Sequence, residues 1–390
     1  MRNTLFKQML LFSLFLVSFQ SGYTQKAPIK FGKIDIEDLK MTTYEYDTSA
    51  VALVLCDFGE FDPDEFEFTR LCRIKILKKE GVSKANVNVR YGGTLILKAK
   101  TYNLVNGEIE TVRMKREAVF EEKVETYIFG TRFSLPNVKE GSIIEFQYTI
   151  RGIPNHWLFQ QDIPVKWSEL RMEPTQYVTM QKNFSGFEAL SIISDTRWVA
   201  KDIPAFRSEP YINSSYNYLT KFEFDVKKIN YYSYHEDINT SWEEVSENLM
   251  ESTNFGDKLS ANLFLNKVAK MIDTLNLSDI EKGKYAYELV RKQIAWNNSK
   301  RLYAYKKLNY VFNTKKSGNC SEINLTLVAL LDKIELKAYP VVLSTRDNGI
   351  LSPLSPSIRK LNYVIASVEI NGETYLLDAT DRHVPFGVLP

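Results

Sequence analysis

The sequence predicts a multidomain protein in which an N-terminal antiparallel β-sandwich precedes an α+β domain. Three patterns predict this order. Short alternating runs with turn residues between them extend from about residue 26 to residue 226, helical periodicity with capping residues begins near residue 241, and strand-like runs return after residue 337. The 390 residues, 44% of them hydrophobic, suffice for two such domains. We place the boundary between residues 25–235 and residues 236–390.

The first half is predicted to form a series of hairpins. The runs "AVALVLCDF" and "FEFTRLCRIKIL" are joined by Gly, Asp and Pro residues, and "TLILKAKTYNL" and "EIETVRM" flank Asn106-Gly107. Asn-Gly between two strands is typical of a tight type I′ hairpin turn. Apolar and polar residues also alternate in "SIIEFQYTI", "YVTMQKNF" and "YLTKFEFDV". Evenly spaced short strands of this kind favour an antiparallel sandwich.

The second half begins with helices. "SWEEVSENLMES" places Glu244 three residues after Ser241, and "SDIEKGKYAYELV" places Glu281 three residues after Ser278. Both spacings fit a capping box, which satisfies the free N–H groups at a helix start. Strand-like runs follow in "AYPVVLSTR", "LNYVIASVEI" and "ETYLLDAT", the last two around Asn371-Gly372. Helices followed by a hairpin sheet predict an α+β domain.

The first residues have the pattern of a secretory signal peptide. Arg2 and Lys7 give a positive start, and Met9–Phe19 form an apolar run that is followed by small residues. A membrane-spanning helix needs about 20 apolar residues, so this run is too short to span. We therefore expect residues 1–24 to be a signal peptide and the mature chain to be periplasmic or secreted, and not membrane-spanning.

Charge and histidine spacing argue against several functions. The net charge is +2 and no long run of Lys and Arg is present, which disfavours a nucleic-acid partner. The three histidines, His156, His235 and His383, are far apart and none has metal-ligand spacing. No Gly-rich phosphate loop follows a strand. We therefore expect neither a metal nor another cofactor.

Cys56 and Cys72 are a possible disulfide, because an exported chain meets an oxidising compartment. The turn between their strands is centred near residue 64, the midpoint of the two positions, so simple pairing would set them opposite one another. Opposed Cβ atoms lie about 4.5–5.5 Å apart, slightly outside disulfide spacing. A bonded pair and two packed thiols both remain open.

Cys320 is predicted to begin a third helix, in "KKSGNCSEINLTLVALLDK". Asn319 fits the N-cap position and Glu322 follows three residues later, so Cys320 would lie in the first helical turn. The free N–H groups and the helix dipole there favour a thiolate, the nucleophile of cysteine hydrolases and acyltransferases. The alternative is a small buried residue packed under a sheet.

The order of elements from Cys320 onward resembles the transglutaminase-like branch of the papain superfamily, a cysteine-protease-like fold. "GNCSEIN" matches the family's Cys motif and "YLLDAT" its "WxxDxT"-like Asp motif, so the resemblance implies catalytic positions at Cys320 and Asp378. The β-rich first half, followed by Trp242 and "IAWNN", looks like an envelope subfamily. Its members join a β-rich N-terminal domain of unknown function to a transglutaminase-like domain.

The chain departs from the family at the catalytic base. Family members with a full triad have His where the alternation in "YVIASV" aligns Tyr363. A phenol titrates near pH 10 and cannot accept a thiol proton as imidazole does. His383 follows Asp378 by five positions and would reach Cys320 only if the tail folded back. We expect Asp378 to face Tyr363 across the Asn371-Gly372 hairpin, since their midpoint is residue 370.5.

These residues predict a degenerate triad of Cys320, Tyr363 and Asp378, and hence a pseudoenzyme. The leading hypothesis is a non-catalytic module of the cell envelope that binds a peptide, protein or polysaccharide. A second is an active thiol peptidase or acyltransferase that uses Cys320 with a base supplied from elsewhere. A third is a purely structural role in which the β domain mediates assembly.

Overall fold

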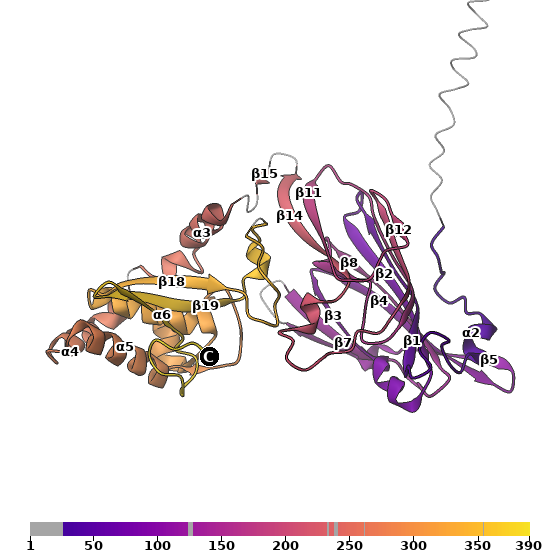
Figure 1. The fold of residues 1–390 in the computed structure, drawn as a ribbon, viewed down its shortest axis with the longest axis horizontal. Helices are drawn as coiled ribbons and strands as arrows, with labels where there is room; N and C mark the ends of the chain where they lie inside the picture. Colours follow the sequence, from indigo (N-terminus) through magenta and orange to yellow (C-terminus); the bar gives the residue numbers. More distant parts are fainter. Residues whose placement is uncertain (1–25, 124–127, 232–233, 238–240, 261, 354) are drawn as a thin grey trace, which may run out of the picture.

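The structure is largely β, with most of its helices in the last part of the chain (Figure 1). This computed structural model describes residues 26–123, 128–231, 234–237, 241–260, 262–353 and 355–390. The predicted signal peptide, residues 1–24, lies outside the described residues. Among the helices described, none is long and apolar enough to cross a membrane.

The described part of the first half contains one short α-helix and fifteen strands. These elements are α2 (Ile36–Lys40), β1 (Ala52–Asp62), β2 (Glu67–Ile76), β3 (Asn86–Gly92), β4 (Leu95–Val105), β5 (Glu108–Arg113), β6 (Val119–Lys123), β7 (Ile128–Ser134), β8 (Ile143–Arg151), β9 (His156–Leu158), β10 (Val165–Met172), β11 (Val178–Ser185), β12 (Ile192–Ile193), β13 (Arg197–Ile203), β14 (Lys221–Tyr231) and β15 (Tyr234–Asp237).

These strands form three sheets. The large one has eight strands in the order β12-β13-β10-β1-β2-β8-β4-β5. A smaller sheet has the order β3-β7-β6, and another has the order β11-β14-β15, with β9 paired to β14. The predicted hairpin at Asn106-Gly107 is confirmed: it joins β4 to β5, and φ is 52° at Asn106 and 84° at Gly107. Positive φ at both central residues is what a type I′ turn requires.

One pairing departs from the predicted antiparallel arrangement. β1 lies parallel to β10, with Val54 opposite Val165, whereas the other neighbours in the large sheet are antiparallel. Parallel neighbours need a long crossover connection, and here the segment of chain that connects β1 to β10 contains β2 to β9. Local alternation records which residues of a strand are buried, but not which distant strand lies beside it.

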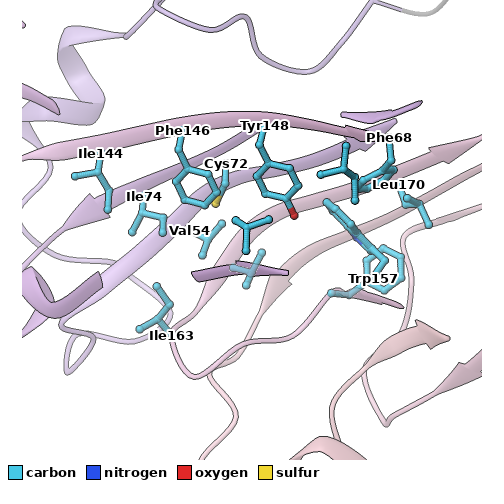
Figure 2. Packing of buried hydrophobic residues seen from close by; sticks show 14 of the residues in the cluster. Val54, Phe68, Cys72, Ile74, Ile144, Phe146, Tyr148, Trp157, Ile163 and Leu170 are labelled. Carbon is cyan, nitrogen blue, oxygen red and sulfur yellow. The ribbon is translucent and has the colours of Figure 1, made fainter. Parts of the chain in front are cut away.

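One hydrophobic core joins the three sheets. Phe68 and Phe146 from the large sheet pack in the same buried cluster as Val89 from β3, Trp157 from β9 and Phe224 from β14. Figure 2 shows part of this cluster, with the aromatic rings of Phe146 and Tyr148 lying beside Cys72 and Trp157 lying near Phe68. Aromatic side chains bury large areas and account for much of this packing.

Cys56 and Cys72 lie on adjacent antiparallel strands, but they do not face each other. A bulge between Val54 and Cys56 shifts the register, so Cys72 is opposite Asp57 and Cys56 is opposite Arg73. Successive residues of a strand point to opposite faces. Cys72 therefore enters the core (Figure 2), whereas Cys56 shares the other face with Arg73. The predicted opposition of the two residues is wrong. Of the two alternatives left open, the structure has two free, buried thiols.

The described second half contains four α-helices and five strands. These are α3 (Trp242–Glu251), α4 (Asn266–Asp273), α5 (Asp279–Gln293), β16 (Ala295–Trp296), β17 (Ser317–Gly318), α6 (Cys320–Lys333), β18 (Lys337–Leu343), β19 (Tyr363–Ile370) and β20 (Glu373–Leu377). The predicted caps are confirmed at Ser241, which accepts from the Glu244 amide, and at Ser278, which forms a capping box with Glu281.

The central helix of this half is α6. It is buried over almost its full length, and Ile323 and Leu327 pack with Val368 of β19 and Leu377 of β20. The strands form an antiparallel sheet in the order β18-β19-β20. The second predicted Asn-Gly hairpin is also confirmed, because β19 and β20 flank Asn371-Gly372. This packing sets the start of α6 close to the start of β19.

Candidate functional site

Cys320 is the first residue of α6, as the sequence predicts. The Asn319 side chain accepts a hydrogen bond from the Glu322 amide at 2.7 Å, and the Glu322 carboxylate accepts one from the Asn319 amide at 3.0 Å. This capping box fixes where the helix begins. The Cys320 side chain is fully buried, with a relative exposure of 0%.

The Cys320 thiol is held by the backbone of Arg301. The Arg301 amide donates to Sγ at 3.2 Å, and the thiol donates to the Arg301 carbonyl oxygen at 3.1 Å. The apolar neighbours are Tyr363 and Ile365 of β19, with Trp296 partly buried beside them. A hydrogen bond from sulfur to a carbonyl oxygen requires the neutral thiol, because a thiolate has no proton to donate.

Burial raises the pKa of the Cys320 thiol above its ordinary value. The amides of Arg301, Val364 and Ser321 act in the opposite direction, and the negative charge of Asp378 raises the pKa further. The Ser321 amide at the helix start acts in the predicted direction, but the net lowering of this pKa that we expected is not found. The physical reason is that desolvation of a fully buried anion outweighs the N–H groups available at one helix end.

Tyr363 is the first residue of β19, and its hydroxyl group is fully engaged. Tyr363 Oη donates to Asp378 Oδ2 at 2.9 Å and lies 2.8 Å from Thr380 Oγ1. The Trp296 ring packs edge-on against the phenol, with 6.3 Å between ring centroids. Burial, and then the charge of Asp378, raise the pKa of Tyr363 far above its ordinary value. The phenol therefore stays protonated at neutral pH and donates rather than accepts a proton.

Asp378 is buried just beyond β20, where several donors orient it. Its Oδ1 accepts from Asn324 Nδ2 at 3.0 Å and from the Thr380 amide at 3.1 Å. The predicted contact with Tyr363 is present, but the register differs from the midpoint estimate. Ala366 pairs with Leu377, so continuing the ladder sets Tyr363 opposite Thr380 instead. The phenol then reaches back to the carboxylate.

Sequence reasoning missed Asn324 and Thr380. Asn324 lies one helical turn after Cys320, and its side chain is completely buried in α6, between Ile323 and Leu325. It bonds both Asp378 Oδ1 and the Val364 carbonyl oxygen, and it accepts from the Ala379 amide at 2.9 Å. A lone amide in a buried helical stripe is the sequence signal that could have identified it, because buried polar groups need partners.

His383 does not join the group around Cys320. Its side chain is exposed, and its amide donates to Asp381 Oδ1 at 2.7 Å. The following residue is held against α5, where Tyr287 Oη and Arg291 Nη1 both donate to the Val384 carbonyl oxygen. None of the Cys320 contacts given above involves His383. Within the described residues no group of three or more His, Cys, Asp and Glu side chains could hold a metal ion.

Comparison with known proteins shows a shared fold. No family model matches the sequence, and no curated protein matches it. The chain is similar to the crystal structure of a candidate protease from Parabacteroides distasonis ATCC 8503, with a TM-score of 0.60 and 12% identity over 86% of this chain and 68% of that one. The match to the periplasmic domain of TgpA from Pseudomonas aeruginosa, bound to ethylmercury, has a TM-score of 0.25 and 11% identity over 78% of this chain and 94% of that one. The first match shows that this chain has the same fold as that crystal structure over most of its length.

Proposed function

We propose that this chain is a transglutaminase-like protein with a degenerate triad, and that it acts as a non-catalytic binding module of the cell envelope. The observation that carries the proposal is the identity of the side chain beside Cys320. Tyr363 stands where the family resemblance calls for a histidine, and its hydroxyl is already bound to Asp378 and Thr380. The periplasmic or secreted location rests on the signal-peptide pattern of residues 1–24.

The chemistry of the site supports an unreactive Cys320 thiol. A cysteine hydrolase must transfer the thiol proton to a base before the sulfur attacks a carbonyl carbon. Cys320 Sγ donates its proton to the Arg301 carbonyl oxygen, which is not basic at neutral pH. The absence of a general base costs typically 10²–10⁴-fold in rate. Desolvation and the nearby charge of Asp378 both oppose formation of the thiolate.

One observation favours the second candidate, a thiol enzyme. The Arg301 amide points at Cys320 Sγ from 3.2 Å, and such a donor would stabilise a thiolate if a base were supplied. The two candidates therefore differ in what the residue at position 363 does. In the binding module Tyr363 has replaced the base, whereas in an enzyme another group must take the proton.

The substitution Tyr363→His tests the proposal without knowledge of a ligand. Asp378 already lies beside the ring and would orient an imidazole, so the variant should carry a thiolate–imidazolium pair. Alkylation by iodoacetamide at pH 6, read at Cys320 by peptide mass spectrometry, should be faster in the variant than in the wild type. Tyr363→Phe is the matched control and should gain nothing. A wild-type Cys320 as reactive at pH 6 as the His variant would contradict the proposal.

A further inference from the structure

A second feature of the molecule is an open edge on each of two small sheets. β3 ends the sheet β3-β7-β6, and β9 pairs with β14 alone among the described strands. Both strands line one cavity of about 660 Å³, together with residues 347–348 and 359–360 of the second half. β3 lies on the side of the β-rich part that faces the second half (Figure 1). The floor includes Phe68 of β2 and Tyr148 of β8.

The pattern of backbone hydrogen bonds determines which peptide groups of β3 point into this gap. The Leu135 amide donates to the Ala85 carbonyl oxygen, in register with the β3–β7 ladder. In an antiparallel strand the backbone N–H and C=O groups of one residue point toward the partner strand, and those of the next residue point away from it. The N–H and C=O groups of Asn88 and Arg90 therefore point away from β7, and both residues line the cavity.

The same reasoning applies to β9. The Phe224 amide donates to the Asn155 carbonyl oxygen, and the Phe159 amide donates to Thr220, both in register with β14. The peptide groups of His156 and Leu158 therefore point away from β14, and these two residues also line the cavity. An exposed row of N–H and C=O groups is a template for a further strand.

The acidic side chains that line the cavity are already engaged. Asp347 accepts from Lys300 at 2.8 Å, and Asp225 accepts from Ser357 at 2.6 Å. The Glu223 carboxylate is bound to Lys360 at 2.9 Å. Cations therefore compensate Asp347 and Glu223, and Glu223 is also held by the Tyr216 hydroxyl. Asp225 keeps its charge, because its partners Ser357 and Asn183 are neutral.

Two cations that line the same cavity, Arg359 and Arg90, have no carboxylate bound to them among the described residues. Arg359 is exposed, and its Nη1 donates to the neutral Asn155 side chain at 3.3 Å. Arg90 is exposed on β3, and no carboxylate binds it among the described residues. A third cation, Arg70, is occupied by Asp57 in a two-pronged ion pair. Asp225 acts on Arg359, but Arg90 and Arg359 together outweigh this one carboxylate and leave positive charge available for a carboxylate ligand.

We propose that the gap between β3 and β9 binds an extended peptide with acidic side chains, which adds a strand to an open edge. Main-chain hydrogen bonds to Asn88 and Arg90 would hold the peptide backbone. Arg90 and Arg359 would select glutamate or aspartate side chains. The choice of a peptide as the partner rests on the proposed binding function. The site itself is separate from Cys320 and does not depend on the reactivity of the thiol.

Fluorescence anisotropy with labelled nine-residue peptides tests this site on the full-length protein. The probe alternates Glu and Val, and the control alternates Lys and Val. A third peptide carries the Glu sequence with N-methyl groups on alternate amides, which removes the donors of one edge. The Glu peptide should bind, and the Lys peptide and the methylated peptide should bind at least tenfold more weakly.

Substitutions then locate the site. Arg90→Ala and Arg359→Ala should each weaken binding about twofold to fivefold, the worth of an exposed ion pair. Arg113→Ala, at an exposed position on β5, is the matched control and should leave binding unchanged. Asn88→Pro removes an amide that faces the gap and should weaken binding about tenfold, whereas Asn88→Ala keeps that amide and should not. Melting temperatures identify any variant that fails to fold.

Failure of this inference differs from failure of the proposed function. Equal binding of the Glu and Lys peptides, or no binding of the Glu peptide at millimolar concentration, would overturn the acidic-peptide site. Unchanged binding in both arginine variants would do the same. Cys320 would still be unreactive in each case, so the non-catalytic reading would stand. Conversely, a reactive Cys320 would overturn that reading while peptide binding in the gap persisted.

Discussion

The replacement Tyr363→Phe tests whether the Tyr363 hydroxyl stabilises the folded state. It removes one hydroxyl group and leaves a ring of nearly the same shape against Trp296. In the wild type this hydroxyl donates to Asp378 Oδ2 at 2.9 Å and lies 2.8 Å from Thr380 Oγ1. Asp378 keeps its bonds from Asn324 and the Thr380 amide, so one carboxylate oxygen loses its donor.

The expected cost is set mainly by the lost bond to the charged carboxylate, with the contact to Thr380 Oγ1 lost as well. A hydrogen bond to a charged group contributes about 1.5–3 kcal/mol to the free energy of unfolding. For a cooperative unit of 150–250 residues, 1 kcal/mol shifts the melting temperature by about 2–4 °C, so Tyr363→Phe should melt about 3–12 °C below the wild type. The thiol reactivity of Cys320 should not change, because the phenol is not its base.

Differential scanning calorimetry at pH 7 provides the assay, and Tyr375→Phe is the matched control. Tyr375 lies on β20 and is half-buried, and its hydroxyl makes no hydrogen bond in the part of the chain that the structure describes. That variant should melt within about 2 °C of the wild type, since substitutions away from specific contacts usually change stability by under 0.5 kcal/mol. Equal melting temperatures for the two variants would refute the structural role of the Tyr363 hydroxyl.

Two further predictions concern the helix cap and pH. Asn319→Ala should lower the free energy of unfolding by about 1 kcal/mol, because it removes the acceptor of the Glu322 amide; urea unfolding measures this, and no change would contradict the capping box. Burial lowers the pKa of Lys75 to about 8, below its unfolded value of about 10.4. The folded state therefore loses this proton first, so from pH 8 to pH 10.4 the wild type should gain up to about 3 kcal/mol relative to Lys75→Met. If the free energies of unfolding of these two proteins changed equally with pH, the lowered pKa of Lys75 would be contradicted.

Local signals in the sequence predicted much of the fold. Asn106-Gly107 and Asn371-Gly372 each specify a turn by backbone sterics alone, and both hairpins are present. The capping residue Asn319 located the start of α6 to the residue. These features could be predicted because each depends on residues within a few positions of one another.

Longer-range features could not be read from the same patterns. The bulge near Cys56 moves the register by one residue, and a shift of one residue sends a side chain to the other face. The pKa of Cys320 depends on the depth at which tertiary packing buries it, which outweighs the local effect of the helix start. The role of Asn324 depends on β19 and Asp378, which lie far away in the sequence and are brought beside it only by the fold.

The pH dependence of Cys320 alkylation in the wild-type protein tests the central claim, an unactivated thiol, most directly. The rate with iodoacetamide is measured from pH 6 to pH 9 by peptide mass spectrometry, in the folded protein and in the same protein unfolded in urea. Because burial raises the thiol pKa, the folded protein should react more slowly than the unfolded chain at every pH, with no plateau below pH 8. A folded-state rate that exceeds the unfolded rate at pH 6 and levels off by pH 7 would contradict the account, since only a thiolate paired with a base behaves in that way.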